Sequence, residues 1–246
     1  MSTPGPSGWQ RRARPLLGTL VEVGAPADAP PQAIAAAFAA VERVQALMSR
    51  FDPASDVARF NALARGEAIA IKASTAEVMH AARELELASG GLFDVSAGCP
   101  QAWRLQGLEL AKQSSEVKLD LGGIAKGYAV DLAVQAMQAA GCEGGWVNAG
   151  GDARAFGPAM LPILLRDEMA GGVRPFVSLS EGAIATSHYG PGSRSQVWRG
   201  GPSLHAHVSV AAPQALWADA LTKIVALSGD TAHPLLNRHQ ARAWLH

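Results

Sequence analysis

The spacing of hydrophobic residues changes along the chain between two repeats, one typical of strands and one typical of helices. Apolar residues recur every three or four positions in several longer segments, and each of these predicts a helix with one buried face. The helices are predicted at residues 34–48, 74–88, 124–140, 213–227 and 234–244.

Short apolar runs bounded by glycine, proline or polar residues predict strands between these helices. Glycine and proline separate the later runs, which favours an antiparallel sheet. Residues 99–118 carry no strong pattern. The predicted strands are 16–23, 68–71, 92–98, 119–121, 146–149, 161–165, 177–179, 183–185 and 206–210.

These elements predict an α+β fold of mixed, largely antiparallel sheets flanked by helices. No internal repeat or low-complexity block divides the chain, so we expect a single domain over residues 15–246. Glycine, proline and arginine in residues 1–14 predict a flexible N-terminal tail.

Residues 119–152 form the most informative stretch, with a predicted strand, glycine turn, helix, strand and second glycine turn. Backbone amides at such a helix start can bind phosphate, and Lys126 in the first turn adds a positive charge. Asp120 indicates either a metal ion shared with the phosphates or a hydrogen bond to the sugar or base of a nucleotide. The alternative is an ordinary turn in which Asp120 caps the helix and Lys126 is solvated.

Two other places in the chain also have more than one interpretation. Met48, at the end of the first helix, either fills the core or touches a flat ring. Asp94 and Ser96 either form a turn or place Ser96 against a ligand. Residues 74–77 match a capping box that opens the second helix.

Composition narrows the class of protein. The 246 residues carry 21 basic and 21 acidic side chains, a balance that does not favour a nucleic-acid surface. Cys99 and Cys142 lie far apart and outside any CxxC pattern, so neither a disulfide framework nor a zinc site is indicated. With no apolar run of signal-peptide or membrane-spanning length, we expect a soluble, cytoplasmic protein without membrane insertion.

Six motifs follow one another along the chain, among them MSRFDPAS, GGLFDVSAG and LDLGGIAKGYAVD. With these motifs, over about residues 17–229, the chain resembles the ApbE family, the FAD:protein FMN transferases. One such motif is weak, but six in order are specific. The motifs occupy residues 48–55 with Asn61, 90–98, 119–131, 148–152, 185–187 and 218–223.

The resemblance implies that the protein binds FAD and, with Mg²⁺, transfers the FMN half of FAD to a threonine or serine hydroxyl of a target flavoprotein, releasing AMP. It also implies roles for individual residues. FAD contacts are implied at Met48, Ser96, Ala97, Gly98, Asp120 and Lys126. Magnesium ligands are implied at the backbone carbonyl of Gly123 and the carboxylate of Asp219.

The chain departs from the family pattern in two places that bear on catalysis. A threonine or serine is usual four residues after the metal aspartate, but here Lys223 takes that position and Thr222 comes one residue early. Either Lys223 displaces the ion and offers its ammonium to the phosphates, or Thr222 is the third metal ligand and Lys223 points elsewhere. The family's histidine-containing segment is also missing, which leaves His188, His205 and His207 as the nearby histidines. His205 and His207 alternate on one strand face, where they either suit a proton relay or a metal or are simply half-exposed sheet residues. His205 is thus a candidate proton acceptor, beside Asp219 and Lys223 as candidate catalytic residues.

Three functions therefore stay open. The first is magnesium-dependent FMN transfer to an acceptor protein. The second is flavin binding or protein interaction without transfer, and it predicts FAD binding that ignores EDTA. The third is hydrolysis of the FAD diphosphate, which would yield FMN and AMP without an acceptor.

Overall fold

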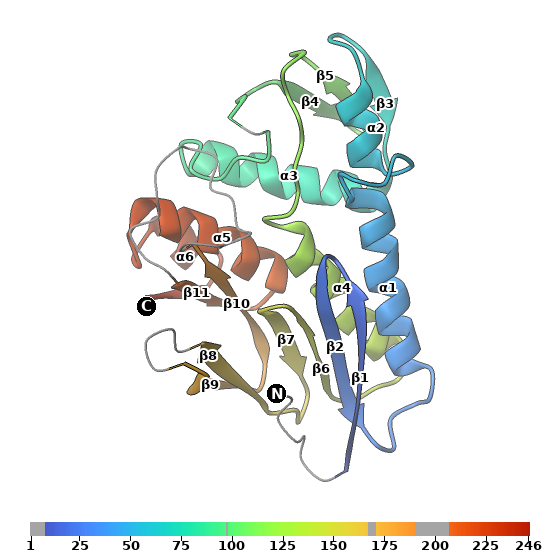
Figure 1. Cartoon of the computed structure of the whole chain (residues 1–246), viewed down its shortest axis with the longest axis vertical. Coiled ribbons are helices and arrows are strands. Elements are labelled where there is room, and N and C mark those ends of the chain that lie inside the picture. Colours follow the sequence, from blue (N-terminus) through green and yellow to red (C-terminus); the bar gives the residue numbers. More distant parts are fainter. Residues whose placement is uncertain (1–7, 97, 167–170, 190–206) are drawn as a thin grey trace.

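The largest sheet of the fold collects strands from both ends of the chain (Figure 1). The computed structural model describes residues 8–96, 98–166, 171–189 and 207–246. Seven strands follow one another across this sheet, and every neighbouring pair is antiparallel. In spatial order they are β1 (Trp9–Leu16), β2 (Thr19–Pro26), β6 (Gly145–Ala149), β7 (Asp152–Phe156), β10 (Gly182–His188), β11 (His207–Ala212) and β12 (Arg242–Leu245).

Three long helices form a layer on this sheet: α1 (Ala33–Met48), α4 (Ala125–Ala139) and α5 (Ala215–Ser228). α1 packs beside α4 and α4 beside α5, and the three contact successive strands of the sheet. Their apolar faces and the inward side chains of the strands make the main core. No helix in the described part of the chain has the length and apolarity to cross a bilayer.

The opposite face of the sheet carries a smaller apolar cluster. Val147 points into the main core while its neighbour Trp146 points the other way, as the pleat of a strand requires. Trp146 packs there with residues of the hairpin β8 (Leu161–Arg166) and β9 (Val173–Leu179).

A second group of elements lies at the top of Figure 1, beyond the end of α1. Its three-stranded sheet has the order β3-β5-β4, and a short helix lies beside it. The buried Lys112 donates a hydrogen bond to the carbonyl of Asn61 at 3.1 Å and so ties that helix to the sheet. The elements are α2 (Asp56–Ala62), β3 (Ala68–Ala70), α3 (Ala73–Ala88), β4 (Trp103–Gln106) and β5 (Glu109–Lys112).

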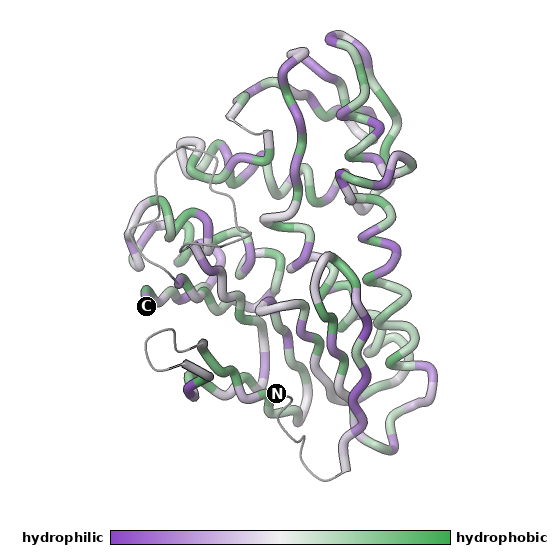
Figure 2. Tube along the Cα trace, viewed as in Figure 1, coloured by the Kyte–Doolittle hydropathy of each residue, from purple (hydrophilic) through white to green (hydrophobic). Residues whose placement is uncertain are grey.

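The expected α+β class and the antiparallel sheets are confirmed, but the predicted N-terminal tail is wrong from Trp9 onward. Residues 9–16 form β1 and pair with β2 along their whole length. Figure 2 shows the hydrophilic trace of this edge strand, where Arg11 forms an ion pair with Glu22 of β2. An edge strand with one face in water needs few apolar residues, so its composition resembles that of a tail.

Two predicted strands are not strands in the structure. Residues 92–96 and Gly98 lie in bends and turns, in which the Asp94 carboxylate accepts hydrogen bonds from the amides of Ser96 at 2.7 Å and Gly98 at 2.8 Å. Residues 119–121 are extended but have no strand partner, because the Asn61 side chain takes the place of one.

Three other predictions are corrected by long-range contacts. The predicted capping box is wrong because α3 begins at Ala73, where Asp56 accepts hydrogen bonds from the Lys72 amide at 2.9 Å and the Thr75 hydroxyl at 2.7 Å. The patternless region 99–118 contains the β4–β5 hairpin. The last helix, α6 (Pro234–Arg238), is short, and the chain continues into β12.

Candidate functional site

Two lysines and two aspartates from three different elements form one group at the start of α4, which we call the charge cluster: Lys126, Asp152, Asp219 and Lys223. Lys126 pairs with Asp152, and its Nζ also lies 3.8 Å from Oδ2 of Asp219. Lys223 pairs with Oδ1 of Asp219 one helical turn away and donates to the Asp219 carbonyl at 2.8 Å. Both carboxylates are buried, with 1% of the Asp152 side chain and 0% of the Asp219 side chain exposed.

The segment that leads into α4, residues 119–121, is held by single hydrogen bonds and is not part of a sheet. The Asn61 side chain donates to the Leu119 carbonyl at 3.0 Å and accepts from the Leu119 amide at 2.7 Å. The Asp120 amide then donates to the Val95 carbonyl at 2.9 Å. Leu119 and Leu121 are buried on either side of Asp120, so the Asp120 side chain points out of the core.

The contact between α4 and α5 fixes Asp219 beside the start of α4. Gly127 leaves room for close packing, since a Cβ on it would lie 2.1 Å from the Ala215 carbonyl oxygen. Its amide donates to Oδ2 of Asp219 at 3.2 Å. One turn further along α4, Asp131 caps α5 by accepting from the amides of Ala215 at 2.9 Å and Leu216 at 2.8 Å.

The charges in the cluster shift one another's proton affinities. Burial lowers the pKa of Lys126, but Asp152 and Asp219 more than offset this and raise it above the usual lysine range. Burial, and then the negative charge of Asp219, raise the pKa of Asp152 to about 6. For Asp219 burial acts upward as well, but Lys126 and Lys223 together hold its pKa below the ordinary value.

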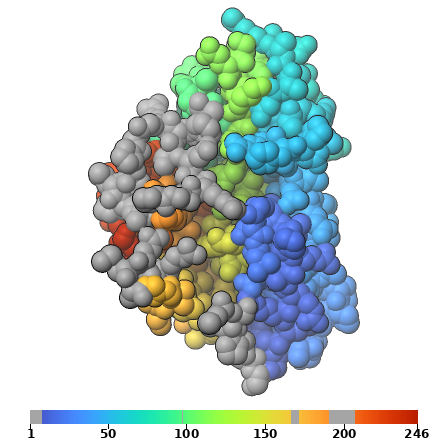
Figure 3. Space-filling view, viewed as in Figure 1, coloured from blue at the N-terminus to red at the C-terminus, as the bar shows by residue number. Residues whose placement is uncertain are grey.

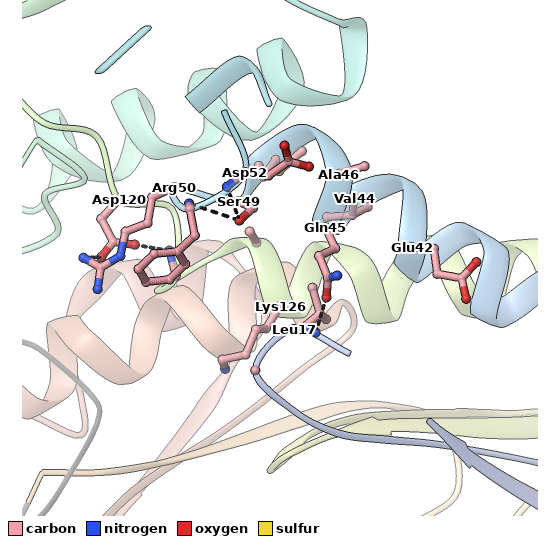
Figure 4. Close-up of a pocket in the computed structure, with 15 residues that line it drawn as sticks. Leu17, Glu42, Val44, Gln45, Ala46, Ser49, Arg50, Asp52, Asp120 and Lys126 are labelled. Carbon is pink, nitrogen blue, oxygen red and sulfur yellow. Dashed lines mark hydrogen bonds and ion pairs between the residues drawn. The ribbon is translucent and has the colours of Figure 1, made fainter. Parts of the chain in front are cut away.

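A cavity of about 460 Å³ opens beside the cluster, between the end of α1 and the start of α4 (Figure 4). Its lining includes Met48, Arg50, Asp120 and Lys126. Arg50 reaches across to Oδ2 of Asp120 at 2.9 Å, as the dashed line in Figure 4 marks. In the space-filling view of Figure 3, the cyan residues that follow α1 lie against the green residues that lead into α4.

A sequence model of the ApbE family matches residues 17–109 and 99–245. The chain belongs to the ApbE family. Its fold is that of the ApbE flavin transferase of Vibrio cholerae, with a TM-score of 0.81 and 20% identity over 98% of this chain and 94% of that one. The apbe protein of Thermotoga maritima gives a TM-score of 0.84 at 23% identity, over 96% and 94% of the two chains.

A curated relative supports the same family at the level of sequence. The FAD:protein FMN transferase of Rhodobacter capsulatus is 28% identical in an alignment 210 residues long that covers 70% of this chain. The chain spans only 40% of the length of that relative.

The FAD contacts implied by the ApbE resemblance fall into two groups. Met48, Asp120 and Lys126 all line the cavity. Ser96 is not among the lining residues: it is fully buried and its hydroxyl donates to the Cys99 carbonyl at 2.8 Å, while the Gly98 amide donates to Asp94. Ala97 lies outside the described residues.

Two of the three groups expected to hold magnesium in an ApbE protein, the side chains of Asp219 and Thr222, are engaged by other residues in this chain and do not fit the ion as they stand. The Asp219 carboxylate is engaged by the Lys223 ammonium on one oxygen and by the Gly127 amide on the other. Thr222 turns its hydroxyl to the Asp219 carbonyl at 2.7 Å and lies 2.9 Å from the Ser187 hydroxyl. Among the described residues, no three His, Cys, Asp or Glu side chains group as a metal site.

The candidate catalytic residues are only partly brought together. Asp219 and Lys223 are in direct contact, whereas His205 lies outside the described residues. His188 and His207 face one another across β10 and β11, with ring centroids 4.6 Å apart.

Sequence reasoning missed two members of the site. Asp152 was visible only as an acidic residue after a glycine pair, and Arg50 only as part of a polar loop. Pairing of β7 with β6 and β10 brings Asp152 to the cluster, and that pairing leaves no local signal.

Proposed function

We propose that this chain transfers the FMN part of FAD to a threonine or serine hydroxyl of an acceptor flavoprotein and releases AMP. One observation carries the proposal: a single cavity is lined by Met48 at the end of α1 and by the ammonium-bearing Lys126 of the charge cluster. Such a site offers apolar contact to a flavin ring and positive charge to a diphosphate. Membership of the ApbE family and the name of the Rhodobacter capsulatus relative support this function.

The proposed reaction exchanges a phosphoanhydride bond for a phosphate ester bond. The acceptor oxygen attacks the phosphorus on the FMN side of the diphosphate, the bond from that phosphorus to the bridging oxygen breaks, and AMP leaves with the electron pair. The hydroxyl proton passes to water as the new bond forms. Positioning and stabilisation of charge are the main tasks of a protein in such a reaction.

The residues of this chain suit those tasks. Lys126 is 30% exposed and faces the cavity, so its ammonium can meet phosphate oxygens as charge builds on the leaving AMP. The ion pair between Arg50 and Asp120 forms part of the wall of the same cavity and holds both side chains in place there.

Magnesium dependence is part of the family expectation, and in a bound state the ion would supply charge neutralisation at the diphosphate. The described donor groups of this chain do not fit it, because Lys223 and Gly127 engage both oxygens of Asp219. The steps above therefore rest on protein groups alone.

Flavin binding without transfer is the second candidate. The contact between Lys223 and Asp219 favours it, because an ammonium supplies one positive charge where a divalent ion supplies two. The third possibility, hydrolysis of the FAD diphosphate, differs in needing no acceptor protein.

One experiment separates the three functions. The protein is incubated with FAD and an acceptor domain carrying an Asp-Gly-Xaa-Thr-Gly-Ala-Thr segment, with Mg²⁺ or with EDTA, and flavin fluorescence is read in a denaturing gel. A fluorescent acceptor band supports transfer, and AMP measured by chromatography should appear in equal amount. FAD binding without a band identifies a binding protein, and FMN and AMP formed without acceptor identify a hydrolase.

A further inference from the structure

We infer that the ammonium of Lys223 is the built-in cation of this site and that, with Lys126, it binds the diphosphate of a nucleotide without a divalent metal ion. The inference deepens the proposed function. It rests on that function only in taking FAD to be the nucleotide. It predicts a metal-independent member of a family whose site is expected to use magnesium.

Lys223 is fixed in place rather than extended into solvent. Only 13% of its side chain is exposed, and its Nζ contacts both the carboxylate and the carbonyl of Asp219. Its methylene chain packs against Gly123: a Cβ added to Gly123 would lie 3.2 Å from Cε of Lys223. The Lys223 side chain therefore lies against Gly123 and ends on Asp219, the two residues that were expected to bind the metal.

Lys126 provides the second positive charge on the other side of the same carboxylate. Its Nζ lies 3.8 Å from Oδ2 of Asp219, while Lys223 is bound to Oδ1. Two ammonium groups thus bracket one buried carboxylate, and the more exposed of them faces the cavity.

The charge balance of the cluster leaves little room for a further cation. Lys126 and Lys223 are balanced by Asp152 and Asp219, so the four side chains sum to zero. A divalent ion placed against Asp219 would have to displace Lys223 and would be repelled by Lys126. A diphosphate instead brings negative charge, and lysine ammonium groups are well suited to phosphate oxygens.

The test measures metal binding and diphosphate binding separately. Mn²⁺ is titrated into the flavin-free protein and followed by electron paramagnetic resonance, and inorganic pyrophosphate and FAD are titrated calorimetrically in EDTA and in Mg²⁺. The variants are Lys223→Thr and Lys223→Met, and the exposed Lys72→Thr is the matched control for loss of a lysine. Circular dichroism establishes that each variant folds.

The wild type is expected to bind no stoichiometric Mn²⁺ and to bind pyrophosphate with dissociation constants in EDTA and Mg²⁺ that agree within about threefold. Lys223→Met should weaken pyrophosphate binding in EDTA at least tenfold, and Lys72→Thr should not. Lys223→Thr should lose the same affinity in EDTA, bind one Mn²⁺ per chain and regain pyrophosphate binding with the metal.

Other outcomes overturn the inference. One Mn²⁺ per wild-type chain, or wild-type pyrophosphate binding that needs Mg²⁺, would show that Lys223 yields to a metal. Both of these measurements use the wild type, so they decide the question even if a variant misfolds. Pyrophosphate binding in EDTA without FAD binding would refute the proposed function and support the two-lysine site. Metal-dependent flavinylation of an acceptor would support the proposed function and refute the metal-independent site.

Discussion

Replacement of Gly127 by alanine tests whether close packing of α4 against α5 holds the site together. In a helix the substitution alone should stabilise by about 1 kcal/mol, because alanine is the better helix former. The structure predicts the opposite sign, since the new Cβ would lie 2.1 Å from the Ala215 carbonyl oxygen and 2.8 Å from the Leu216 amide nitrogen.

The magnitude follows from how far the helices must separate. An ordinary contact between carbon and a carbonyl oxygen is about 3.3 Å or more, so α5 has to retreat by about 1 Å. Overpacking of this kind costs about 1–3 kcal/mol. The same movement breaks the 3.2 Å hydrogen bond from the Gly127 amide to Asp219. A hydrogen bond to a charged group contributes about 1.5–3 kcal/mol, so after the gain in propensity we expect a net loss of about 1.5–5 kcal/mol.

Urea unfolding followed by circular dichroism measures this loss as a lower midpoint at unchanged slope. Alanine and glycine variants at the exposed Gln138 of the same helix give the propensity term alone. Calorimetric titration of FAD should show weaker binding by Gly127→Ala, because Asp219 and Lys223 move with α5. A variant as stable as wild type would refute the close packing, and a loss of stability with unchanged FAD affinity would separate that packing from the site.

Three further predictions concern single side chains. Asn61→Ala should lower the free energy of unfolding by about 1–3 kcal/mol and weaken FAD binding, because two backbone groups of Leu119 lose their partner, whereas the exposed Asn237→Ala should do neither. Lys126→Met leaves the buried Asp152 without its cation, so we expect a loss near the lower end of the roughly 3–5 kcal/mol typical of broken buried pairs, larger at pH 8 than at pH 5; an equal loss at both pH values would contradict the pairing. Burial lowers the pKa of His239 in the folded state below its value in the unfolded state. The stabilising contribution of neutral His239 is therefore complete above the unfolded pKa and is lost as the pH falls from there through the folded pKa. The difference in unfolding free energy between wild type and His239→Gln should therefore shrink between pH 7 and pH 5, and an unchanged difference would contradict burial as the cause.

The helices and the sheet class could be predicted because their signals are local. Apolar spacing predicts α1, α3, α4 and α5 within one or two residues at most ends, since each helix buries one continuous face. The errors share a different cause. β1 reads as a polar tail, and residues 92–98 read as a strand, because edge position and turn formation depend on partners distant in sequence.

The start of α3 shows the same limit at the level of one residue. Sequence alone favoured a cap within residues 74–77, but the capping oxygen comes from Asp56. Asp56 itself lies in α2, whose N-cap is Ser55. Because Asp56 reaches the start of α3 through space, no fixed spacing in the sequence predicts this contact.

Asp120 and Lys126 could be recognised before the structure, because a glycine turn ahead of a helix is a local pattern. Asp152 could not, because β-pairing alone brings it to Lys126. The resemblance to the ApbE family located Asp219, and it left two orientations open for Lys223. In the structure the Lys223 side chain folds back one turn onto Asp219 and lies against Gly123, as the first orientation requires.

The contact between Lys223 and Asp219 helps to explain why the two buried aspartates, Asp152 and Asp219, can lie near one another. Asp219 raises the pKa of Asp152, so the pair would be unfavourable without cations. Lys126 touches both carboxylates and Lys223 touches the one that is completely buried, so each negative charge has a positive partner supplied by the chain itself. A site that depended on a metal would be left with excess negative charge whenever the ion dissociated. Here the cations are covalently part of the protein, so the site proposed for an anionic ligand is already assembled before any ligand arrives.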